Sequence, residues 1–222
     1  MTSLARKIPR NAALLISLLV LIVVAPLIPM ERYWFLVELI FDTILLAGVY
    51  SVGPGKSRWP FLVLTVLTFG VRWGELLAGY RALNLGAMTI TVVWLVCAVS
   101  IIITHLFQRR DVTVDTIMGS VVPYLLVAIA FAMSFEIIEI RSPGSFSGLP
   151  DGVLGDRPRL GNAMMYFSLV CITTMGYGDI VPVSGAARPF VVMEGVFGQL
   201  YLAVMIARLV GLHLVSERQL DD

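Results

Sequence analysis

Long apolar runs separated by short polar breaks make up most of the chain of 222 residues. Six of these runs have about the 20 residues that an α-helix needs to cross the hydrocarbon core of a bilayer. They lie near residues 11–29, 33–52, 60–80, 85–107, 116–140 and 188–215. The first run follows a basic start, but it is longer than the apolar part of a signal peptide and no cleavage site follows it. The pattern predicts an all-α membrane protein with six transmembrane helices.

The segment between the fifth and sixth runs has a different pattern. Residues 141–162 are rich in Gly, Pro, Ser and Asp, as expected of a solvent-facing loop. Residues 163–173 are largely apolar but too few to cross a bilayer, so we expect a re-entrant helix. Non-helical backbone at membrane depth survives only when it is buried in protein or lines a water-filled cavity. The segment ITTMGYGD (172–179), which overlaps the end of this helix and continues past it, is therefore expected to line a pore or cavity.

Composition supports a membrane protein. Hydrophobic residues make up 58% of the chain and charged residues 14%, against roughly 45–50% and about 25% in soluble domains. The net charge of +1 argues against a nucleic-acid partner. Cys97 and Cys171 lie inside apolar runs and are expected to be buried thiols rather than a disulfide. Loops on one side carry more Lys and Arg, which predicts that both termini are cytoplasmic and that the re-entrant loop opens outward.

Two kinds of membrane protein could carry ITTMGYGD. An intramembrane aspartyl protease has Gly-x-Gly-Asp, which residues 176–179 match, and it needs a second aspartate that shares a proton with the first. Asp42, the only other aspartate well inside an apolar run, is far away in the sequence. A potassium pore has Thr-x-Gly-Tyr-Gly, which residues 174–178 match. The preceding short helix and the missing second aspartate favour the pore.

A potassium pore replaces the water around K⁺ with rings of backbone carbonyls. The expected filter residues are Thr174, Met175, Gly176, Tyr177 and Gly178, with K⁺ bound at the first four. Glycine tolerates the backbone conformations that aligned carbonyls require, and the side chains of Met175 and Tyr177 are expected to point away and brace the loop. The carbonyl end of the short helix places partial negative charge toward the cation. One chain supplies one strand of the filter, so we expect a homotetramer.

On the motif TTMGYGD, residues 116–215 resemble the pore module of tetrameric potassium channels. The chain resembles bacterial six-transmembrane members of the voltage-gated-like cation channel superfamily, although over residues 1–115 the resemblance rests mainly on the number of spans. It implies a sensor-like unit of four helices (1–110) and a pore domain (111–222) with outer helix, pore helix, filter and inner helix. It also implies passive K⁺ conduction in a prokaryotic plasma membrane, with K⁺ and lipids as partners, no catalysis, no organic cofactor and no nucleic acid.

The resemblance also assigns roles around the filter. Tyr166 falls where an aromatic residue of the pore helix commonly bonds the aspartate after the filter, here Asp179; the alternative is an interfacial Tyr166 and a solvated Asp179. Val170 stands where some channels have a glutamate, so no buried acid is expected behind the filter. Met175 replaces the common Val, Ile or Leu, which leaves a weakly selective cation pore as an alternative. The protease and a non-conducting scaffold also stay open.

The fourth run, residues 85–107, has no Lys or Arg. A voltage sensor needs several arginines in the membrane field, so we predict weak voltage dependence. In the last run, Gly195 and Gly198 are candidate gating hinges, with close packing the favoured alternative for Gly195. Arg208 either pairs with an aspartate of the linker, Asp111 or Asp115, or reaches the lipid phosphates.

Other ionisable residues within or beside the runs require partners. Glu38 or Asp42 of the second run could reach Arg72 of the third, as a static ion pair or as a proton- or ligand-linked switch. Glu136 and Glu139, at the outer end of the fifth run, either brace the re-entrant loop or are solvated.

Overall fold

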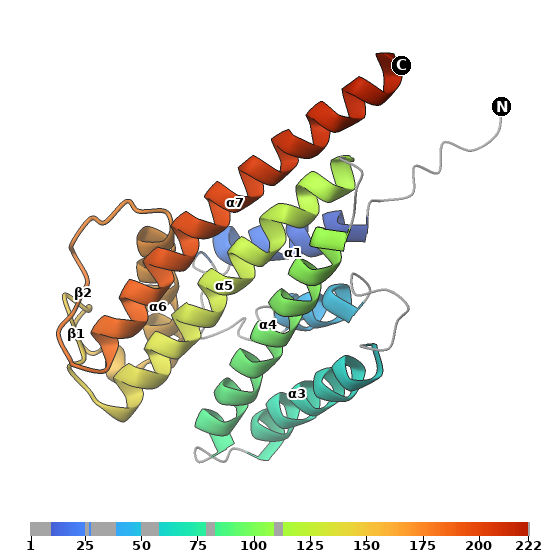
Figure 1. Ribbon diagram of the computed structural model, residues 1–222. Helices are drawn as coiled ribbons and strands as arrows, with labels where there is room; N and C mark the ends of the chain where they lie inside the picture. Colours follow the sequence, from blue (N-terminus) through green and yellow to red (C-terminus); the bar gives the residue numbers. More distant parts are fainter. Residues whose placement is uncertain are drawn as a thin grey trace.

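The computed structural model describes residues 10–24, 27, 39–49, 58–78, 83–108 and 113–221, which are almost entirely helical (Figure 1). The helices are α1 (Arg10–Val24), Leu39–Val49, α3 (Arg58–Ala78), α4 (Leu83–Gln108), α5 (Val114–Arg141), α6 (Arg157–Ile172) and α7 (Ala187–Asp221), with the 3₁₀ turn η2 (Val153–Gly155) before α6. The strands are β1 (Phe146–Ser147) and β2 (Val181–Pro182).

Three of these helices have the length and apolarity needed to cross a membrane: Leu85–Gln108, Val114–Arg141 and Ala187–Leu212. The apolar helices Asn11–Val24, Leu39–Val49 and Trp59–Gly74 are shorter. Parts of the expected runs 11–29 and 33–52 lie outside the described residues. The chain is therefore a helical membrane protein, and six spanning helices remain a prediction.

Helix α6 begins six residues earlier than the sequence predicted for the re-entrant helix, 163–173. Asp156 is its N-cap, and the carboxylate accepts a hydrogen bond of 3.2 Å from the Arg159 amide. Pro158 occupies the first turn, where its missing N–H costs no hydrogen bond. The end of the segment 141–162 is thus helix rather than loop, because a capping residue and a proline outweigh its polar composition.

Two short strands are the exception to the all-α prediction. β1 pairs antiparallel with β2, with Phe146 opposite Pro182 and Ser147 opposite Val181. The pairing joins the loop before α6 to the segment that follows residues 172–179, so the two ends of the re-entrant segment are held together.

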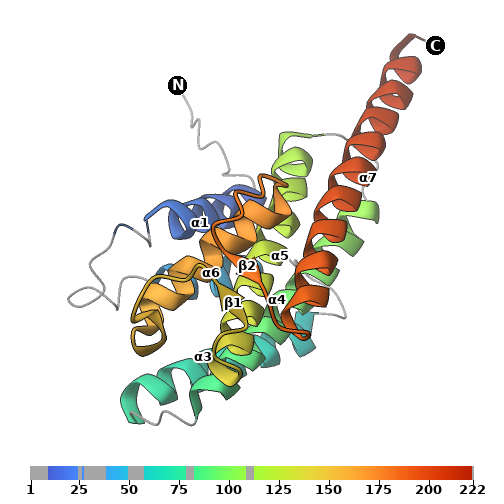
Figure 2. The same ribbon diagram turned by 90° about the vertical axis from the view of Figure 1, so that its left-hand side faces the viewer.

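Helix α5 is the centre of the packing and contacts α1, α4, α6 and α7 (Figure 1). Leu14 and Leu18 of α1, Leu95 of α4, and Leu126 and Ile129 of α5 are fully buried in one hydrophobic cluster. The core therefore crosses the predicted domain boundary at residue 110, although the functional division there stays a prediction. The C-terminal end of α7 projects beyond the other helices in both views (Figures 1 and 2).

The second and third apolar helices are joined by polar and aromatic contacts. Trp73 Nε1 donates a hydrogen bond of 3.1 Å to Asp42 Oδ2. The Arg72 guanidinium lies 4.2 Å from the centre of the Phe41 ring. These contacts join the two helices, while the predicted ion pair of Asp42 with Arg72 stays a prediction and Glu38 lies outside the described residues.

Trp94 connects α4 to α3. The fully buried ring stacks on Phe61 at 5.2 Å, and Nε1 donates to Thr65 Oγ1 at 2.8 Å. The Thr65 hydroxyl in turn donates to the Phe61 carbonyl at 2.8 Å. The three groups form a continuous chain of donors and acceptors inside the bundle.

Trp94→Phe should remove the indole hydrogen bond while keeping an aromatic ring, and lower the free energy of unfolding by about 1 kcal/mol. Thr65→Val should cost a similar amount, and the double variant should cost less than the sum, because both changes remove one bond. Denaturation in detergent measures the three values. Thr65→Ser, which keeps the hydroxyl, is the control; strictly additive losses would show that the two side chains do not interact.

Candidate functional site

The segment after α6 runs back along the helix it follows (Figure 2). The amides of Met175 and Gly176 donate to the Val170 carbonyl at 3.0 and 3.3 Å. In a planar trans peptide, N–H and C=O point in opposite directions. Because both amides point toward α6, the carbonyls of Thr174 and Met175 point away from it. Two successive carbonyl oxygens therefore face the same side, whereas those of an ordinary strand alternate.

The backbone conformation alternates along this segment. Thr174, Gly176 and Gly178 have positive φ angles of 61°, 56° and 75°, whereas Met175 and Tyr177 do not. Glycine adopts this conformation without cost. A threonine with positive φ is uncommon, and such strain clusters at functional sites. The two glycines of the motif thus occupy positions where any other residue would be strained.

The side chains of Met175 and Tyr177 are 61% and 66% exposed. The bracing role predicted for these two side chains stays a prediction.

Tyr166 and Asp179 meet at the outer end of the segment, as the sequence predicted. The Tyr166 hydroxyl donates to Asp179 Oδ2 at 2.7 Å. This hydrogen bond lowers the pKa of Asp179 below its ordinary value. The contact joins α6 to the chain that leaves residues 174–178, the expected filter, which we call the filter segment.

Glu139, near the end of α5, binds the backbone of the loop that leads to α6. Its buried carboxylate accepts hydrogen bonds from the amides of Gly144 at 2.7 Å and Phe146 at 3.0 Å. Gly148, with φ of 83°, lies so close to Asp179 that a Cβ there would be 1.7 Å from the Asp179 carbonyl oxygen. Of the two alternatives for Glu139, the brace is confirmed.

The lower end of the segment is held by α5 and α7. The Tyr124 hydroxyl donates to the Ile172 carbonyl at 2.8 Å. A Cβ at Gly198 would lie 2.7 Å from the same oxygen, whereas a Cβ at Gly195 would meet nothing within 4 Å. Close packing, expected at Gly195, is found at Gly198 instead. The hinge role of either glycine stays a prediction.

A buried acid lies behind the filter segment, contrary to the expectation based on Val170. Glu194 of α7 is fully buried, and its Oε1 is hydrogen-bonded to the Ser168 hydroxyl of α6. The expectation was wrong because it considered only the pore-helix position. The missed signal was a glutamate within an apolar run.

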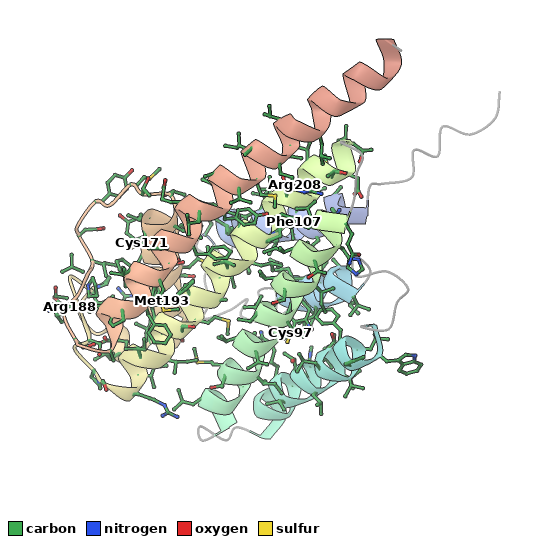
Figure 3. The ribbon with its side chains drawn as sticks, in the orientation of Figure 1. Cys97, Phe107, Cys171, Arg188, Met193 and Arg208 are labelled. Atoms are coloured by element: carbon green, nitrogen blue, oxygen red, sulfur yellow. The ribbon has the colours of Figure 1, made fainter. Side chains whose placement is uncertain are left out.

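Arg208 ties the inner helix to α4. Its guanidinium donates to the Leu106 carbonyl in the last turn of α4 and lies 5.0 Å from the centre of the Phe107 ring (Figure 3). Asp111 lies outside the described residues. Asp115 accepts a hydrogen bond of 3.0 Å from the Asn11 amide of α1. The linker aspartate thus anchors α1, and the arginine caps α4.

Comparison with known proteins finds a family match over the part of the chain that holds this site. Residues 156–212 match the protein family described as "Ion channel". The match begins at the N-cap of α6 and runs through the filter segment into α7, so it covers the site described above. An ion-channel domain is therefore present in this part of the chain.

Two relatives cover part of the chain. The chain is 30% identical over 87 residues to "Protein LctB" of Bacillus caldotenax, and 29% identical over 87 residues to "Protein LctB" of Geobacillus stearothermophilus. Each match covers 39% of this chain and 64% of the relative. No solved structure matches the chain.

Gly198→Ala should destabilise the protein by about 1–3 kcal/mol, because the new methyl group would overlap the Ile172 carbonyl and side chain. Gly195→Ala is the matched control in the same helix. It should be neutral or stabilising by up to about 1 kcal/mol through helix propensity. Thermal unfolding of both variants in detergent tests the difference; equal stability would refute the close approach.

Tyr166→Phe should raise the pKa of Asp179 back toward about 4. In the wild type, the hydrogen bond from Tyr166 to the Asp179 carboxylate is fully present at pH values above the ordinary pKa of a carboxyl group. It is lost as the pH falls through the lowered pKa of Asp179. The Phe variant lacks this bond at every pH, so its filter function should be weakened already at neutral pH and should not show the further loss of the wild type on acidification. Ion flux from liposomes against pH measures this, with Asp179→Asn as the non-titrating control. Identical acid profiles in wild type and Tyr166→Phe would contradict the role of this bond.

Proposed function

We propose that four copies of this chain form a potassium-selective channel that conducts K⁺ passively across a membrane. The observation that carries the proposal is the pair of adjacent carbonyls, on Thr174 and Met175, that face one exposed side of the segment 174–178. The match to the ion-channel family over the same residues supports the class.

Carbonyl oxygens on one side are what a dehydrated cation requires. K⁺ sheds its water only where oxygens replace the hydration shell at matched spacing. The alternating positive φ angles at Thr174, Gly176 and Gly178 favour continuation of the same carbonyl direction along the segment. The carbonyl end of α6 lies at the base of this segment and adds partial negative charge toward the cavity. We therefore assign K⁺ binding to residues 174–177.

One chain provides one wall of such a site, and its exposed surface suits a homotetramer. The whole segment 173–179 is exposed in a single chain, including the apolar side chain of Met175. The outer half of α7 likewise exposes large apolar side chains: Phe190, Val192, Met193, Val196 and Leu200. Contact with neighbouring copies and with lipid would cover these groups, and both termini would be cytoplasmic in this arrangement.

Voltage is not the proposed stimulus. Helix α4 contains neither Lys nor Arg, so it has no gating charge to move through the membrane field. The Arg208 contact with α4 nevertheless links the inner helix to the N-terminal helices. A stimulus acting on those helices would reach α7 through this contact.

The decisive experiment is reconstitution of the purified chain into liposomes with opposed K⁺ and Na⁺ gradients. We expect a reversal potential close to the K⁺ equilibrium potential and a nearly linear response to a voltage ramp. Gly178→Ala, strained at φ of 75°, should abolish the flux. Equal K⁺ and Na⁺ permeability would favour the weakly selective alternative, in which Met175 loosens the filter.

The other classes predict different outcomes. Absence of flux under all gradients would favour a non-conducting scaffold. Peptide cleavage abolished by Asp179→Asn would favour the aspartyl protease. Against the protease, Asp179 is exposed and bonded to a tyrosine, whereas a catalytic dyad needs two carboxylates that share a proton.

A further inference from the structure

A fully buried carboxyl group lies where three helices meet behind the filter segment. Glu194 of α7 directs Oε1 to the hydroxyl of Ser168 of α6. The Ser168 Oγ atom also lies 2.7 Å from the carbonyl oxygen of Ala128 of α5. One oxygen from each helix thus belongs to a single hydrogen-bonded row: Ala128 O, Ser168 Oγ and Glu194 Oε1.

The number of protons in this row of oxygens determines whether Glu194 is protonated. Each of the two contacts needs one proton between its oxygens, and a serine hydroxyl supplies only one. The Ala128 carbonyl is an acceptor, so the Ser168 proton lies on that side. The contact between Ser168 Oγ and Glu194 Oε1 then needs its proton from Glu194. An ionised carboxylate has none to give.

The surroundings agree with a neutral acid. The second oxygen, Glu194 Oε2, is buried and has no hydrogen-bond partner in the described part of the chain. A buried carboxylate would need a basic partner or several donors. The titratable groups that interact with Glu194 from the neighbouring helices are Tyr124 of α5 and Cys171 of α6, both ordinarily neutral at pH 7. Neither supplies a positive charge.

The position of this acid connects it to the filter. Ser168 lies one helical turn before Ile172, the last residue of α6, and Glu194 lies one turn before Gly198. The Gly198 backbone contacts Ile172, whose carbonyl also accepts the Tyr124 hydroxyl. The carboxyl tie and the glycine contact therefore fasten adjacent turns of α7 to the last turns of α6.

We propose that Glu194 is a protonated positioning residue whose proton ties α7 to α6 and α5 behind the filter, and that removal of this proton loosens the filter. The second half rests on the proposed channel function. Once ionised, Glu194 leaves two acceptors for the single Ser168 proton, so one of the two oxygen contacts becomes repulsive.

Infrared spectroscopy of the wild-type protein in liposomes tests whether Glu194 is protonated, and it does not require ion conduction. The wild-type minus Glu194→Gln difference spectrum should show the C=O band of a protonated carboxyl at neutral pH, replaced by carboxylate bands at alkaline pH. Ser168→Ala keeps the acid but removes its partner and should shift the band, which provides the assignment if Glu194→Gln does not fold. Carboxylate bands at neutral pH would overturn the proposal.

K⁺ flux against pH tests the consequence. Wild-type flux should be lost as the pH is raised from neutral into the alkaline range. Glu194→Gln should keep its flux over this range, because an amide can donate to Ser168 and does not ionise. Tyr124 and Cys171 are unchanged in this variant, so an equal loss of flux in Glu194→Gln would overturn the role of the Glu194 proton. A carboxyl band without flux at any pH would refute the channel function and leave the proton tie standing.

Discussion

Two hydrogen bonds to one carbonyl set the direction of the backbone on which the site depends. The Val170 oxygen receives the amides of Met175 and Gly176, and the planar peptide then directs the preceding carbonyls to the opposite side. Carbonyl dipoles that face one side repel each other and are exposed to solvent in a single chain. A cation among them would remove this repulsion, and so the geometry that costs energy in the free chain is the geometry through which the proposed channel would bind K⁺.

The contacts around this segment hold it at both ends. At the outer end, Tyr166 binds Asp179, and Glu139 orders the loop whose β1 strand pairs with β2. At the inner end, the Ile172 carbonyl meets both the Tyr124 hydroxyl and the backbone of Gly198. The contacts of Glu139 and Tyr124 are at least partly buried, so breaking them would leave polar groups without a partner. A strained backbone persists only where its surroundings determine it in this way.

The sequence predicted the parts of the site that depend on local chemistry. The motif indicated the expected filter segment, and the resemblance paired Tyr166 with Asp179. The Tyr166 hydroxyl oxygen lies 2.7 Å from Asp179 Oδ2. It missed the contacts that depend on the relative position of two helices. Helix α7 is apolar on almost every face, so its sequence pattern does not indicate which residues face α6. The contacts of Glu194 and Gly198 with α6, and of Arg208 with α4, therefore could not be predicted. The early start of α6 was missed for a different reason, because polar composition was given more weight than the capping aspartate and the proline.

Glu194 and Arg208 belong to two parts of α7 that make different contacts. Glu194 belongs to the half that packs on α6, whereas Arg208 lies beyond it and contacts the end of α4. Between them, Tyr201 donates to the Ser120 carbonyl of α5 and stacks on Phe197, which anchors the middle of the helix. In the proposed channel, a displacement of α4 would thus act first on the part of α7 beyond this anchor, through the Arg208 contact. The inner end of the proposed pore could then move while the part of α7 around Glu194 stays held by α6.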